Sequence, residues 1–415
     1  MNHKLELSDE QQAMEQGVHG PALRWSIKQQ IGAARFFRAK RLIPAVSAHV
    51  GVEIGIMGGP GLAIVEELAA SGARVRIPSV TAACSVDFCR WKEFCLPAEH
   101  VAKEERLHVL LRGMGLIDSS TCINYQSVSP PRYQEHLAWG DTGSVTFANG
   151  VVGARSNYEG GPAALAAALT GLVPEYGYHL QDNRRATVIY EVDFKLQDIS
   201  DWGALGALIG SELANYWQVP VIVAEGSEPS VDELKHLAAS LASFGSIAMF
   251  HVVGVTPDAK TLVEACHGNM DIPRRIISRP DLAQVYNRYS AQESKVDLVV
   301  FSAPQLSMYE VVDIINRLGS RRIAAHTRMV ITVNHQTHSE LTRLGYADTL
   351  HAAGAEFLTG TCFYVMSPAD VRKRFGFKTL VTPSAKLANI IGASGYLPVL
   401  RSVESCVEAA VAGVI

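Results

Sequence analysis

The chain has 415 residues, of which 48% are hydrophobic and 19% are charged. This composition supplies enough apolar material for large cores and argues against a disordered chain, and the length predicts two or three domains. The net charge is −4 and no dense stripe of Lys and Arg occurs, which disfavours nucleic acid as a partner.

The start of the chain has no apolar stretch of the kind found in signal peptides. No apolar run reaches membrane-spanning length either. We therefore expect a cytoplasmic protein that does not contact a membrane. In that compartment the seven cysteines are expected to be thiols or metal ligands rather than disulfides.

Strand and helix patterns alternate along the chain, which predicts α/β layers with largely parallel sheets. Ser8 is the expected N-cap of the first helix. In chain order the pattern predicts a helix at 8–37, a strand at 42–47, a helix at 62–71, a strand at 74–78, a helix from 162, a strand at 186–194, a helix at 205–217, a strand at 219–224, a helix at 231–244, strands at 247–253 and 296–302, a helix at 308–318 and a strand at 328–333.

The segment 153–171 carries the strongest functional signal. Arg155, Asn157 and Glu159 precede a glycine pair, and an alanine-rich helix follows with Pro162 in its first turn. Glycines let the backbone approach a ligand, a helix N-terminus offers free N–H groups, and arginine presents a planar fork of donors. The segment is a candidate anion site, although a polar turn before a core helix explains the pattern equally well.

Several common nucleotide and hydrolase motifs are absent from the sequence. The glycine-rich stretch 55–61 lacks the spacing of a dinucleotide-binding loop, and neither a P-loop nor a G-x-S-x-G elbow occurs. These absences disfavour a dinucleotide enzyme, a P-loop enzyme and an α/β-hydrolase.

The cysteines divide into two groups. Three lie close together, at spacings that are not those of a zinc finger or ribbon and that favour packing or surface roles: Cys84, Cys89 and Cys95. Cys122 follows a polar segment, Cys362 ends a predicted strand, and Cys406 lies near the start of the last helix, where a thiolate is favoured. On spacing alone, three scattered cysteines are more often buried small hydrophobes.

Histidines and a short hydroxyl–lysine pattern add candidates. His49 lies at a strand end, where it could act in catalysis or simply satisfy a core hydrogen bond. His179 and the arginine pair 184–185 follow the segment of the candidate anion site and could add positive charge to it. Ser384 and Lys386 open a predicted helix two residues apart, which suggests a second anion cradle, although the bare pattern is weak.

Taken together, these segments resemble the aconitase X family of the aconitase superfamily over nearly the whole chain. The most specific matching piece is 153–171, followed by Pro174-Glu-Tyr-Gly-Tyr-His179 and Asn183-Arg184. The other matching pieces are Ser47-Ala-His49, Ile77-Pro-Ser-Val-Thr81 with Asp87 and Trp91, Ser120-Thr-Cys122, Asp201-Trp-Gly-Ala-Leu-Gly206, the segment 250–257, Gly360-Thr-Cys362 and the segment of Ser384 and Lys386.

The resemblance implies an aconitase-like fold of α/β/α layers, with residues 1–415 forming one catalytic region of two or three tightly packed subdomains. It also implies a hydro-lyase with an iron–sulfur cluster or a mononuclear iron. Cys122 and Cys362 fall on family cysteine positions, and Cys406 matches a C-terminal one less securely, so these three are the expected metal ligands. Three thiolates leave one iron with open positions, which suits Lewis-acid catalysis.

The chain ends without the small swivelling domain of aconitase-type sites, which is therefore expected as a separate subunit.

Family members dehydrate cis-3-hydroxy-L-proline in bacteria and a phosphorylated mevalonate in archaea. The resemblance therefore implies dehydration of a small 3-hydroxy acid, here cis-3-hydroxy-L-proline to Δ1-pyrroline-2-carboxylate, by iron-assisted β-elimination. No residue is identified as the base that removes the C2 proton. The residues expected to bind substrate are Arg155, His179, Ser384 and Lys386. The expected catalytic residues are Arg155, Asn157, Glu159 and His49.

The sequence departs from the family pattern at three places. Pro383 replaces an Asn, Ala82 replaces another Asn, and Ala303-Pro-Gln305 stands where many members read Cys-Pro-His. These departures keep two alternatives open. One is the dehydration of a phosphorylated hydroxy acid, for which the arginine pair 184–185 could bind the phosphate. The other is a non-catalytic iron–sulfur scaffold.

Overall fold

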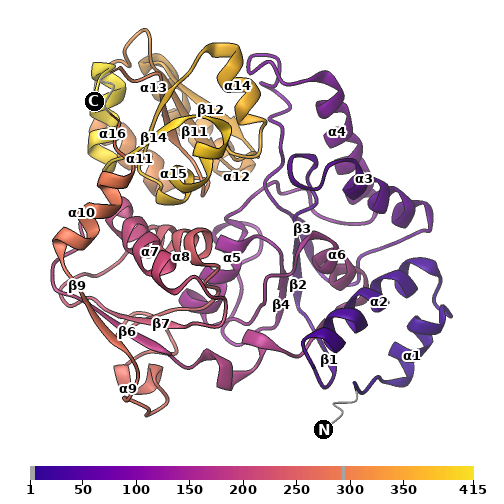
Figure 1. The fold of residues 1–415 in the computed structure, drawn as a ribbon. Coiled ribbons are helices and arrows are strands. Elements are labelled where there is room, and N and C mark those ends of the chain that lie inside the picture. Colours follow the sequence, from indigo (N-terminus) through magenta and orange to yellow (C-terminus); the bar gives the residue numbers. More distant parts are fainter. Residues whose placement is uncertain (1–4, 292–294) are drawn as a thin grey trace.

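The computed structural model describes residues 5–291 and 295–415. Three parallel sheets follow one another along the chain, each accompanied by helices (Figure 1). This multi-layered arrangement confirms the predicted α/β fold with largely parallel sheets. We call the parts that carry the three sheets the N-terminal region (5–182), the middle region (186–291) and the C-terminal region (295–415). No helix in the described stretches has both the length and the apolar character needed to cross a membrane.

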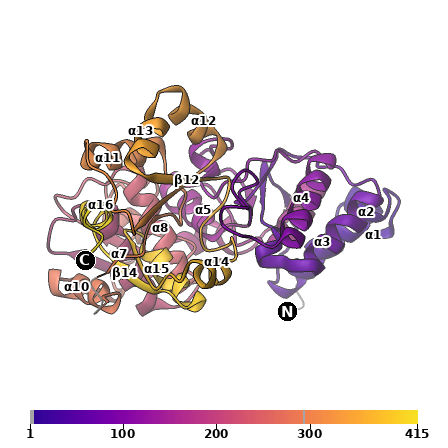
Figure 2. The same ribbon diagram turned by 90° about the horizontal axis from the view of Figure 1, so that it is seen from above.

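The N-terminal region contains a small parallel sheet and a short antiparallel ribbon. Its strands are β1 (Leu42–Pro44), β2 (Ser47–Val50), β3 (Ser79–Thr81), β4 (Leu137–Trp139) and β5 (Leu172–Pro174). Its helices are α1 (Asp9–Gln16), α2 (Pro21–Phe36), α3 (Ile54–Ala70), α4 (Ala98–Gly113), α5 (Thr142–Phe147) and α6 (Gly161–Thr170), with short helical turns η1 (Asn124–Gln126), η2 (Ala148–Val152), η3 (Gly177–His179) and η4 (Gln181–Arg184). The parallel sheet has the order β3-β2-β4, and β1 pairs with β5. Seen from above, α1 to α4 project to one side, whereas α5 lies within the body of the molecule (Figure 2).

The middle region is a four-stranded parallel sheet with helices packed on it. Its elements are β6 (Val188–Val192), α7 (Ile199–Leu213), β7 (Pro220–Val223), α8 (Val231–Gly245), β8 (His251–Val252), α9 (Leu262–Ala265), β9 (Arg274–Ile277) and α10 (Arg279–Arg288). The strand order is β8-β7-β6-β9. Helices α7 and α8 approach closely because glycines face each other, and a Cβ on Gly245 would lie 2.2 Å from Gly210 O. Helix α8 also contacts α5, so it joins the middle and N-terminal regions.

The C-terminal region is a five-stranded parallel sheet of order β12-β11-β10-β13-β14. Its strands are β10 (Leu298–Phe301), β11 (Arg328–Val333), β12 (Ala355–Thr359), β13 (Thr379–Thr382) and β14 (Leu397–Leu400). Its helices are α11 (Met308–Leu318), α12 (His335–Arg343), α13 (Tyr346–Ala353), α14 (Pro368–Phe375), α15 (Ala385–Ile391) and α16 (Val403–Ala412), with the turn η5 (Gly392–Ser394). Helix α15 packs against α7 and α8, which joins this region to the middle one.

Two hydrophobic cores cover opposite faces of the C-terminal sheet. Leu298 and Val300 belong to a core that also takes in Trp139 of the N-terminal region and Trp202 of the middle region. The alternate residues of β10, including Val299, belong to the second core. Because side chains alternate along a strand, the first core lies between the three regions and the second lies on the far face of this sheet.

The helix predicted at 8–37 is two helices. Ser8 is the N-cap of α1, as predicted, and forms a capping box with Gln11. The helix then ends because Gly17 adopts φ of +88°, a left-handed conformation that suits glycine. A new helix starts at Pro21, whose ring favours a first helical turn.

Some predicted strands are shorter or displaced, and two elements have the predicted bounds. The strand predicted at 42–47 is divided between β1 and β2, because its two halves pair with different partners. No strand forms at 74–78, and β3 begins directly after it. The strand predicted at 247–253 is confined to β8. Helix 308–318 and strand 328–333 are found as predicted.

Candidate active site

The loops that follow strands of two parallel sheets meet in the core between the regions. In the C-terminal sheet, β11 and β13 lie on opposite sides of β10, so the chain order reverses there. Open α/β sheets bind ligands outside the carboxyl ends of their strands at such a reversal. The loop after β3 reaches this edge, because Cys84 pairs with Thr361 in an isolated parallel bridge.

Cys122 and Cys362 lie together at this junction, and we call their surroundings the thiol centre. Gln305 N donates a 3.3 Å hydrogen bond to Cys122 Sγ, and Ser302 Oγ lies 3.4 Å from Cys362 Sγ. The segment 302–305 therefore touches both sulfurs. Burial raises the pKa of both thiols, and Cys362 adds to the rise for Cys122. Two of the three predicted metal ligands are thus side by side.

The side chain of Gln305 joins the two loops that carry these cysteines. Its Oε1 accepts hydrogen bonds from Thr121 Oγ1 at 2.8 Å and from Cys122 N at 3.2 Å. Its Nε2 donates to Ser120 O at 3.2 Å and to Thr361 O at 3.1 Å. Gln305 is fully buried. It therefore fixes the relative position of the two cysteine loops.

Lys386 brings a positive charge to the thiol centre. It lies in the first turn of α15, is 6% exposed, and its Nζ is 5.7 Å from the centre of the Tyr364 ring. Burial alone would lower the pKa of Lys386, but Asp141 and the two thiols outweigh it and raise the pKa. In residues 5–291 and 295–415, no carboxylate oxygen lies within 4.0 Å of Nζ. Asp141 thus stabilises this buried ammonium from beyond ion-pair distance, and the lack of a direct carboxylate partner among the described residues makes Lys386 a candidate to bind an anionic ligand.

His49, at the carboxyl half of β2, presents a free ring nitrogen. Its Nε2 lies 2.8 Å from Thr121 O, and because a carbonyl only accepts, Nε2 carries the proton. Burial lowers the pKa of His49, although Asp141 opposes this, so the ring is neutral near pH 7. The buried Nδ1 has no hydrogen-bond partner among the described residues. It is therefore available as a proton acceptor or a ligand.

Two carboxyl groups of the thiol centre were not predicted from the sequence. Glu53, at the start of α3, is buried, and burial together with Glu104 and Asp141 raises its pKa to about 8. It therefore keeps its proton at neutral pH. Asp141 caps α5 by accepting from Ser144 N at 3.0 Å, and Lys386 with His49 lowers its pKa against the effect of burial. Both carboxyl groups follow the last residues of strands in the N-terminal sheet.

Arg155 and His179 form a second group at the other end of β4. Arg155 donates to His179 O at 3.0 Å and to Gln181 Oε1 at 2.6 Å, and its buried Nε has no partner in the described stretches. Burial, with neighbouring positive groups, lowers the pKa of His179 to about 3. The backbone of Arg155 pairs with that of His136 in an isolated bridge. Asp141, which acts on the charge of Lys386, follows His136 by five residues, a span of roughly 16 Å in an extended chain. The structure therefore does not place Arg155 beside Lys386.

Asn157 lies near this second group, whereas Glu159 lies at the carboxyl end of β4, where its N donates to Trp139 O at 3.0 Å. Asn157 Oδ1 accepts from Tyr178 N at 3.0 Å and from Tyr216 Oη at 2.8 Å, and Nδ2 donates to Tyr176 O at 3.1 Å. These bonds hold the loop around 176–178, so the Asn157 side chain is engaged in structure. Burial raises the pKa of Glu159 to about 7, and its Oε1 has no partner in the described part of the chain.

Two further groups expected at anion sites are engaged inside the protein. Ser384 Oγ caps α15 by accepting from Leu387 N at 3.1 Å, and it donates to Ala303 O at 2.6 Å. Arg184 is fully buried and pairs with Asp258 at 3.0 Å. Its guanidinium also donates to two backbone carbonyls. Neither Ser384 nor Arg184 presents a free donor to a ligand.

Cys406, the third predicted metal ligand, lies in the second core. It is fully buried on α16, and its sulfur donates to Arg401 O at 3.7 Å. Because this core covers the far face of the C-terminal sheet, Cys406 is separated from Cys122 and Cys362 by the sheet itself. The expected trio of cysteines is not assembled.

The thiol centre fits a metal group held by Cys122 and Cys362, whereas Cys406 lies on the far face of the sheet and cannot be its third ligand. Position 303, on the segment between the two sulfurs, is an alanine. Unpartnered buried polar atoms remain nearby, namely His49 Nδ1 and both side-chain polar atoms of Asn124, which follows Cys122 closely in the chain. Buried polar groups are normally paired, so these atoms are consistent with a bound group at the centre.

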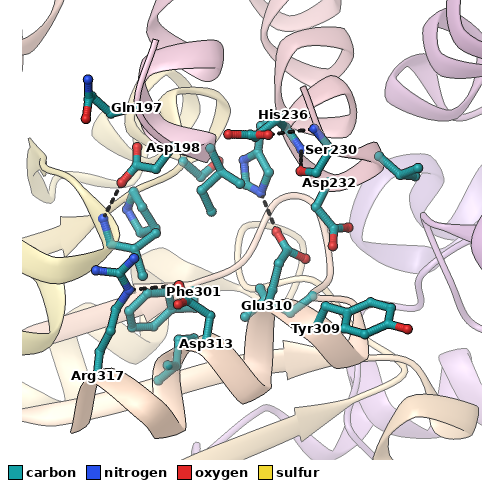
Figure 3. Close-up of a pocket in the computed structure, with 18 of the residues that line it drawn as sticks. Gln197, Asp198, Ser230, Asp232, His236, Phe301, Tyr309, Glu310, Asp313 and Arg317 are labelled. Atoms are coloured by element: carbon teal, nitrogen blue, oxygen red, sulfur yellow. Dashed lines mark hydrogen bonds and ion pairs between the residues drawn. The ribbon is translucent and has the colours of Figure 1, made fainter. Parts of the chain in front are cut away.

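A cavity of about 500 Å³ lies next to the thiol centre, lined by the starts of α7, α8 and α11 (Figure 3). Its basic side chains are already engaged: His236 Nε2 lies 2.8 Å from Glu310, and Arg317 donates to Asp313 at 2.8 Å. The carboxylates of Asp198 and Glu233 also line the cavity, with no basic partner among the described residues. Since no basic side chain in the described lining is free to bind an acidic ligand, the thiol centre is the stronger candidate site.

Comparisons with known proteins agree on one family along the chain. Sequence models of the first, second and third domains of aconitase X match residues 4–182, 186–287 and 296–412. The chain is 33% identical to the phosphomevalonate dehydratase large subunit of Methanothermobacter thermautotrophicus, over 94% of each chain. It is 35% identical to the cis-3-hydroxy-L-proline dehydratase of Pseudomonas aeruginosa, over 97% of this chain and 69% of that one.

A solved structure gives the same result. The holo-form of Thermococcus kodakaraensis aconitase X superposes with a TM-score of 0.88 and 28% identity, covering 98% of this chain and all of that one. Together, the three domain matches, the relatives and this structural likeness show that the chain belongs to the aconitase X family of hydro-lyases.

Proposed function

We propose that this chain dehydrates a small 3-hydroxy acid, and that cis-3-hydroxy-L-proline is its substrate. The observation that carries the proposal is the buried Lys386 ammonium, which forms no ion pair within 4.0 Å in the described residues and lies near Asp141 and the two thiols. A substrate carboxylate would supply the direct charge-assisted hydrogen bond that Lys386 does not make to Asp141. The 35% identity to the Pseudomonas aeruginosa enzyme named for this substrate supports the choice.

The residues of the thiol centre account for the proton transfers of a β-elimination. His49 Nδ1 accepts the proton from substrate C2, and the electron pair of that C–H bond forms the C2=C3 double bond. The C3–O bond breaks with its electron pair, and the protonated carboxyl of Glu53 donates its proton, so the hydroxyl leaves as water. The resulting enamine tautomerises to Δ1-pyrroline-2-carboxylate.

Cys122 and Cys362 are the proposed ligands of an iron or iron–sulfur group. Such a group, when bound, supplies a Lewis acid for the leaving hydroxyl. The burial of both cysteines keeps bulk water from the place where the substrate reacts. We assign the substrate carboxylate to Lys386 rather than to Arg155, because Arg155 lies at the opposite end of β4.

We also propose that the chain works with a separate small subunit. Relatives named as large subunits are matched almost end to end, over 94% of the Methanothermobacter thermautotrophicus protein and 99% of the Thermococcus kodakarensis one. The Pseudomonas aeruginosa dehydratase is matched over 69% of its length, so it holds a further part. A small swivelling domain of aconitase type would account for that part.

A phosphorylated hydroxy acid is the second candidate substrate. It is favoured by the 33% identity to a phosphomevalonate dehydratase large subunit. The engagement of Arg184 with Asp258 argues against it, because this guanidinium cannot bind phosphate without breaking a buried ion pair. A non-catalytic scaffold is the third candidate, favoured by the alanine at position 303.

One anaerobic experiment separates these candidates. The chain is co-expressed with a candidate small subunit and offered cis-3-hydroxy-L-proline or 5-phosphomevalonate, while product formation and iron content are measured together. Turnover of the hydroxyproline that disappears in Cys122→Ala supports the proposal. Turnover of the phosphorylated acid alone would move the substrate to the second candidate, and iron without any turnover would favour the scaffold.

A further inference from the structure

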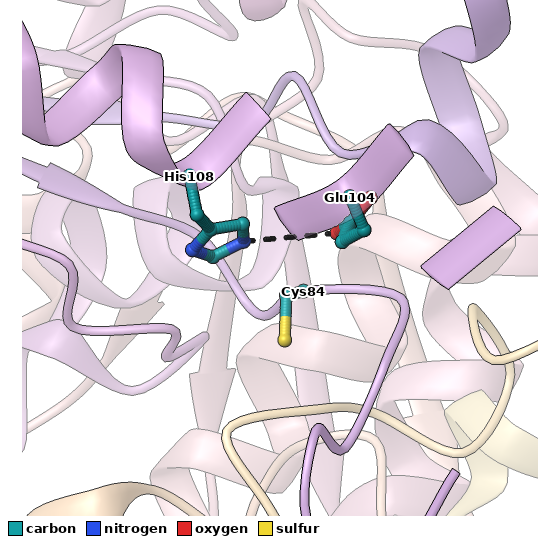
Figure 4. A group of neighbouring side chains, drawn as sticks. All are labelled: Cys84, Glu104 and His108. Atoms are coloured by element: carbon teal, nitrogen blue, oxygen red, sulfur yellow. Dashed lines mark ion pairs between the residues drawn. The ribbon is translucent and has the colours of Figure 1, made fainter. Parts of the chain in front are cut away.

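Three side chains with metal-binding atoms meet in the N-terminal region, outside the thiol centre (Figure 4). Glu104 and His108 are four residues apart on α4 and so project from one face of the helix. Cys84 comes from the loop after β3. One donor atom of each residue lies within 4.8 Å of the other two, and all three side chains are buried. A thiol, an imidazole and a carboxylate are all ligands of Zn²⁺.

The spacing of the imidazole and the carboxylate suits a shared ion. His108 Nε2 lies 3.8 Å from Glu104 Oε1, longer than an ordinary hydrogen bond. Two ligand atoms that are each about 2.0–2.1 Å from a tetrahedral Zn²⁺ are roughly 3.3 Å apart. A small inward movement of either side chain would therefore bring both atoms to coordination distance.

The groups around Glu104 and His108 hold these two side chains in ligand orientations, whereas Cys84 Sγ donates to Val86 O at 2.9 Å and to Gly360 O at 3.1 Å and would exchange these bonds for the ion. His108 Nδ1 lies 2.8 Å from Asp118, so the opposite ring nitrogen faces Glu104. A carboxylate on the far nitrogen of a histidine is the usual support for a zinc ligand. The Glu104 carboxylate accepts backbone N–H bonds from Ile54 at 2.7 Å and from Ser85 at 2.8 Å, which fix its direction.

A small cavity of about 10 Å³ adjoins Cys84 and His108. This is about the space that one water molecule needs. Zinc sites with three protein ligands complete their tetrahedron with a water molecule. The cavity is lined by Cys84, His108 and Glu53 but not by Glu104, so it offers space for a water molecule beside two of the three proposed ligands.

We propose that Cys84, Glu104 and His108 form a second metal site of this protein, which takes Zn²⁺. With the Cys84 thiol deprotonated and His108 neutral, the two negative ligands balance the charge of the ion. Asp118 keeps its own partner, because Arg112 donates to it at 3.2 Å. The buried charges therefore remain balanced with the ion bound.

The position of the site gives the metal a supporting role. Cys84 N donates to Gly360 O at 3.0 Å, and Thr361 Oγ1 donates to Cys84 O at 2.7 Å. These bonds join the metal site to the loop that carries Cys362. Glu104 also binds the amide of Ile54, at the start of α3 beside Glu53. A metal here would therefore restrict the motion of the loops that carry Cys362 and Glu53.

Cobalt(II) is the probe, because its bond to a thiolate gives a near-ultraviolet absorption band. The full chain carries Cys122→Ser and Cys362→Ser, so that the thiol centre cannot produce this band. Titration with Co²⁺ is expected to give a thiolate band at one equivalent, displaced by Zn²⁺. The band should vanish in an added Cys84→Ser variant and persist in an added Cys406→Ser variant, which removes another buried cysteine.

Asp118→Asn provides a milder test, should Cys84→Ser fail to fold. Loss of the supporting carboxylate is expected to weaken Co²⁺ binding roughly 10–100-fold with the band retained. No thiolate band in the starting variant, or a band that survives Cys84→Ser, would overturn the proposal and leave an ion pair of His108 with two carboxylates. Because no substrate is present, this result is independent of the proposed dehydratase activity.

Discussion

Replacement of Lys386 by Met tests the proposed binding of the substrate carboxylate. Methionine keeps much of the length and apolar volume of the side chain, so the packing against Tyr364 is largely retained. The ammonium group is lost, and the substrate carboxylate then enters a buried site without its partner. The variant should fold, and its thermal unfolding measured without substrate serves as the control.

The expected loss follows from the burial of this ammonium. A hydrogen bond to a charged group contributes about 1.5–3 kcal/mol. At 1.36 kcal/mol for each factor of ten, kcat/KM should fall roughly 10- to 150-fold. The carboxylate is charged both before and during the elimination, so the interaction is of similar strength in the ground and transition states. The loss should therefore lie mainly in KM.

Steady-state kinetics of the chain co-expressed with the proposed small subunit measure this effect. Lys386→Arg, which restores a positive charge, should recover part of the affinity, and Arg155→Ala serves as the comparison at the other end of β4. A Lys386→Met variant with unchanged KM, together with an Arg155→Ala variant whose KM rises, would refute the assignment and return the carboxylate to Arg155.

Four other variants test the thiol centre in three predictions. Cys122→Ser should lower the bound iron measured by elemental analysis, whereas Cys406→Ser should leave it unchanged, because the C-terminal sheet separates them. Glu53 has a pKa of about 8, above that of a free carboxyl, so it stabilises the fold at low pH and this contribution falls as pH rises toward 8. Glu53→Gln should therefore flatten the decline in unfolding free energy between the pKa of a free glutamate, roughly 4.3, and the folded-state pKa of about 8. Gln305→Ala should lower the unfolding free energy by about 2–4 kcal/mol in denaturant titrations, since it leaves buried donors and acceptors without partners.

The layered fold could be predicted from the sequence because its signals are local. Helix α11 has a Ser307 cap and a clear apolar face, and its predicted bounds are those found. The errors have local structural causes as well. The first helix was predicted too long because its hydrophobic pattern continues across Gly17, whose left-handed conformation ends α1. Strand β8 was overestimated because the apolar run before it is buried without joining the sheet.

The composition of the thiol centre was only partly predictable. Cys122, Cys362, Lys386 and His49 were candidates by type and position, and they do lie together. Sequence reasoning could not separate Cys406 from them, because the face of a sheet to which a helix packs depends on tertiary structure. Glu53 was missed for a related reason, since its raised pKa comes from burial between regions and not from its neighbours in the chain.

The structure relates two departures from the family pattern, Ala303 and Gln305, to the loops that carry Cys122 and Cys362. In the sequence, Ala303 and Gln305 look like separate changes at positions facing a substrate. In the structure, Gln305 is fully buried and bridges both cysteine loops, while Ala303 O accepts a hydrogen bond from Ser384. The amide of Gln305 thus preserves the arrangement of Cys122 and Cys362 without help from a third thiolate. If the proposed iron binds there, two protein sulfurs would leave it more open positions than three would, with room for substrate oxygens and for ligands from the proposed small subunit.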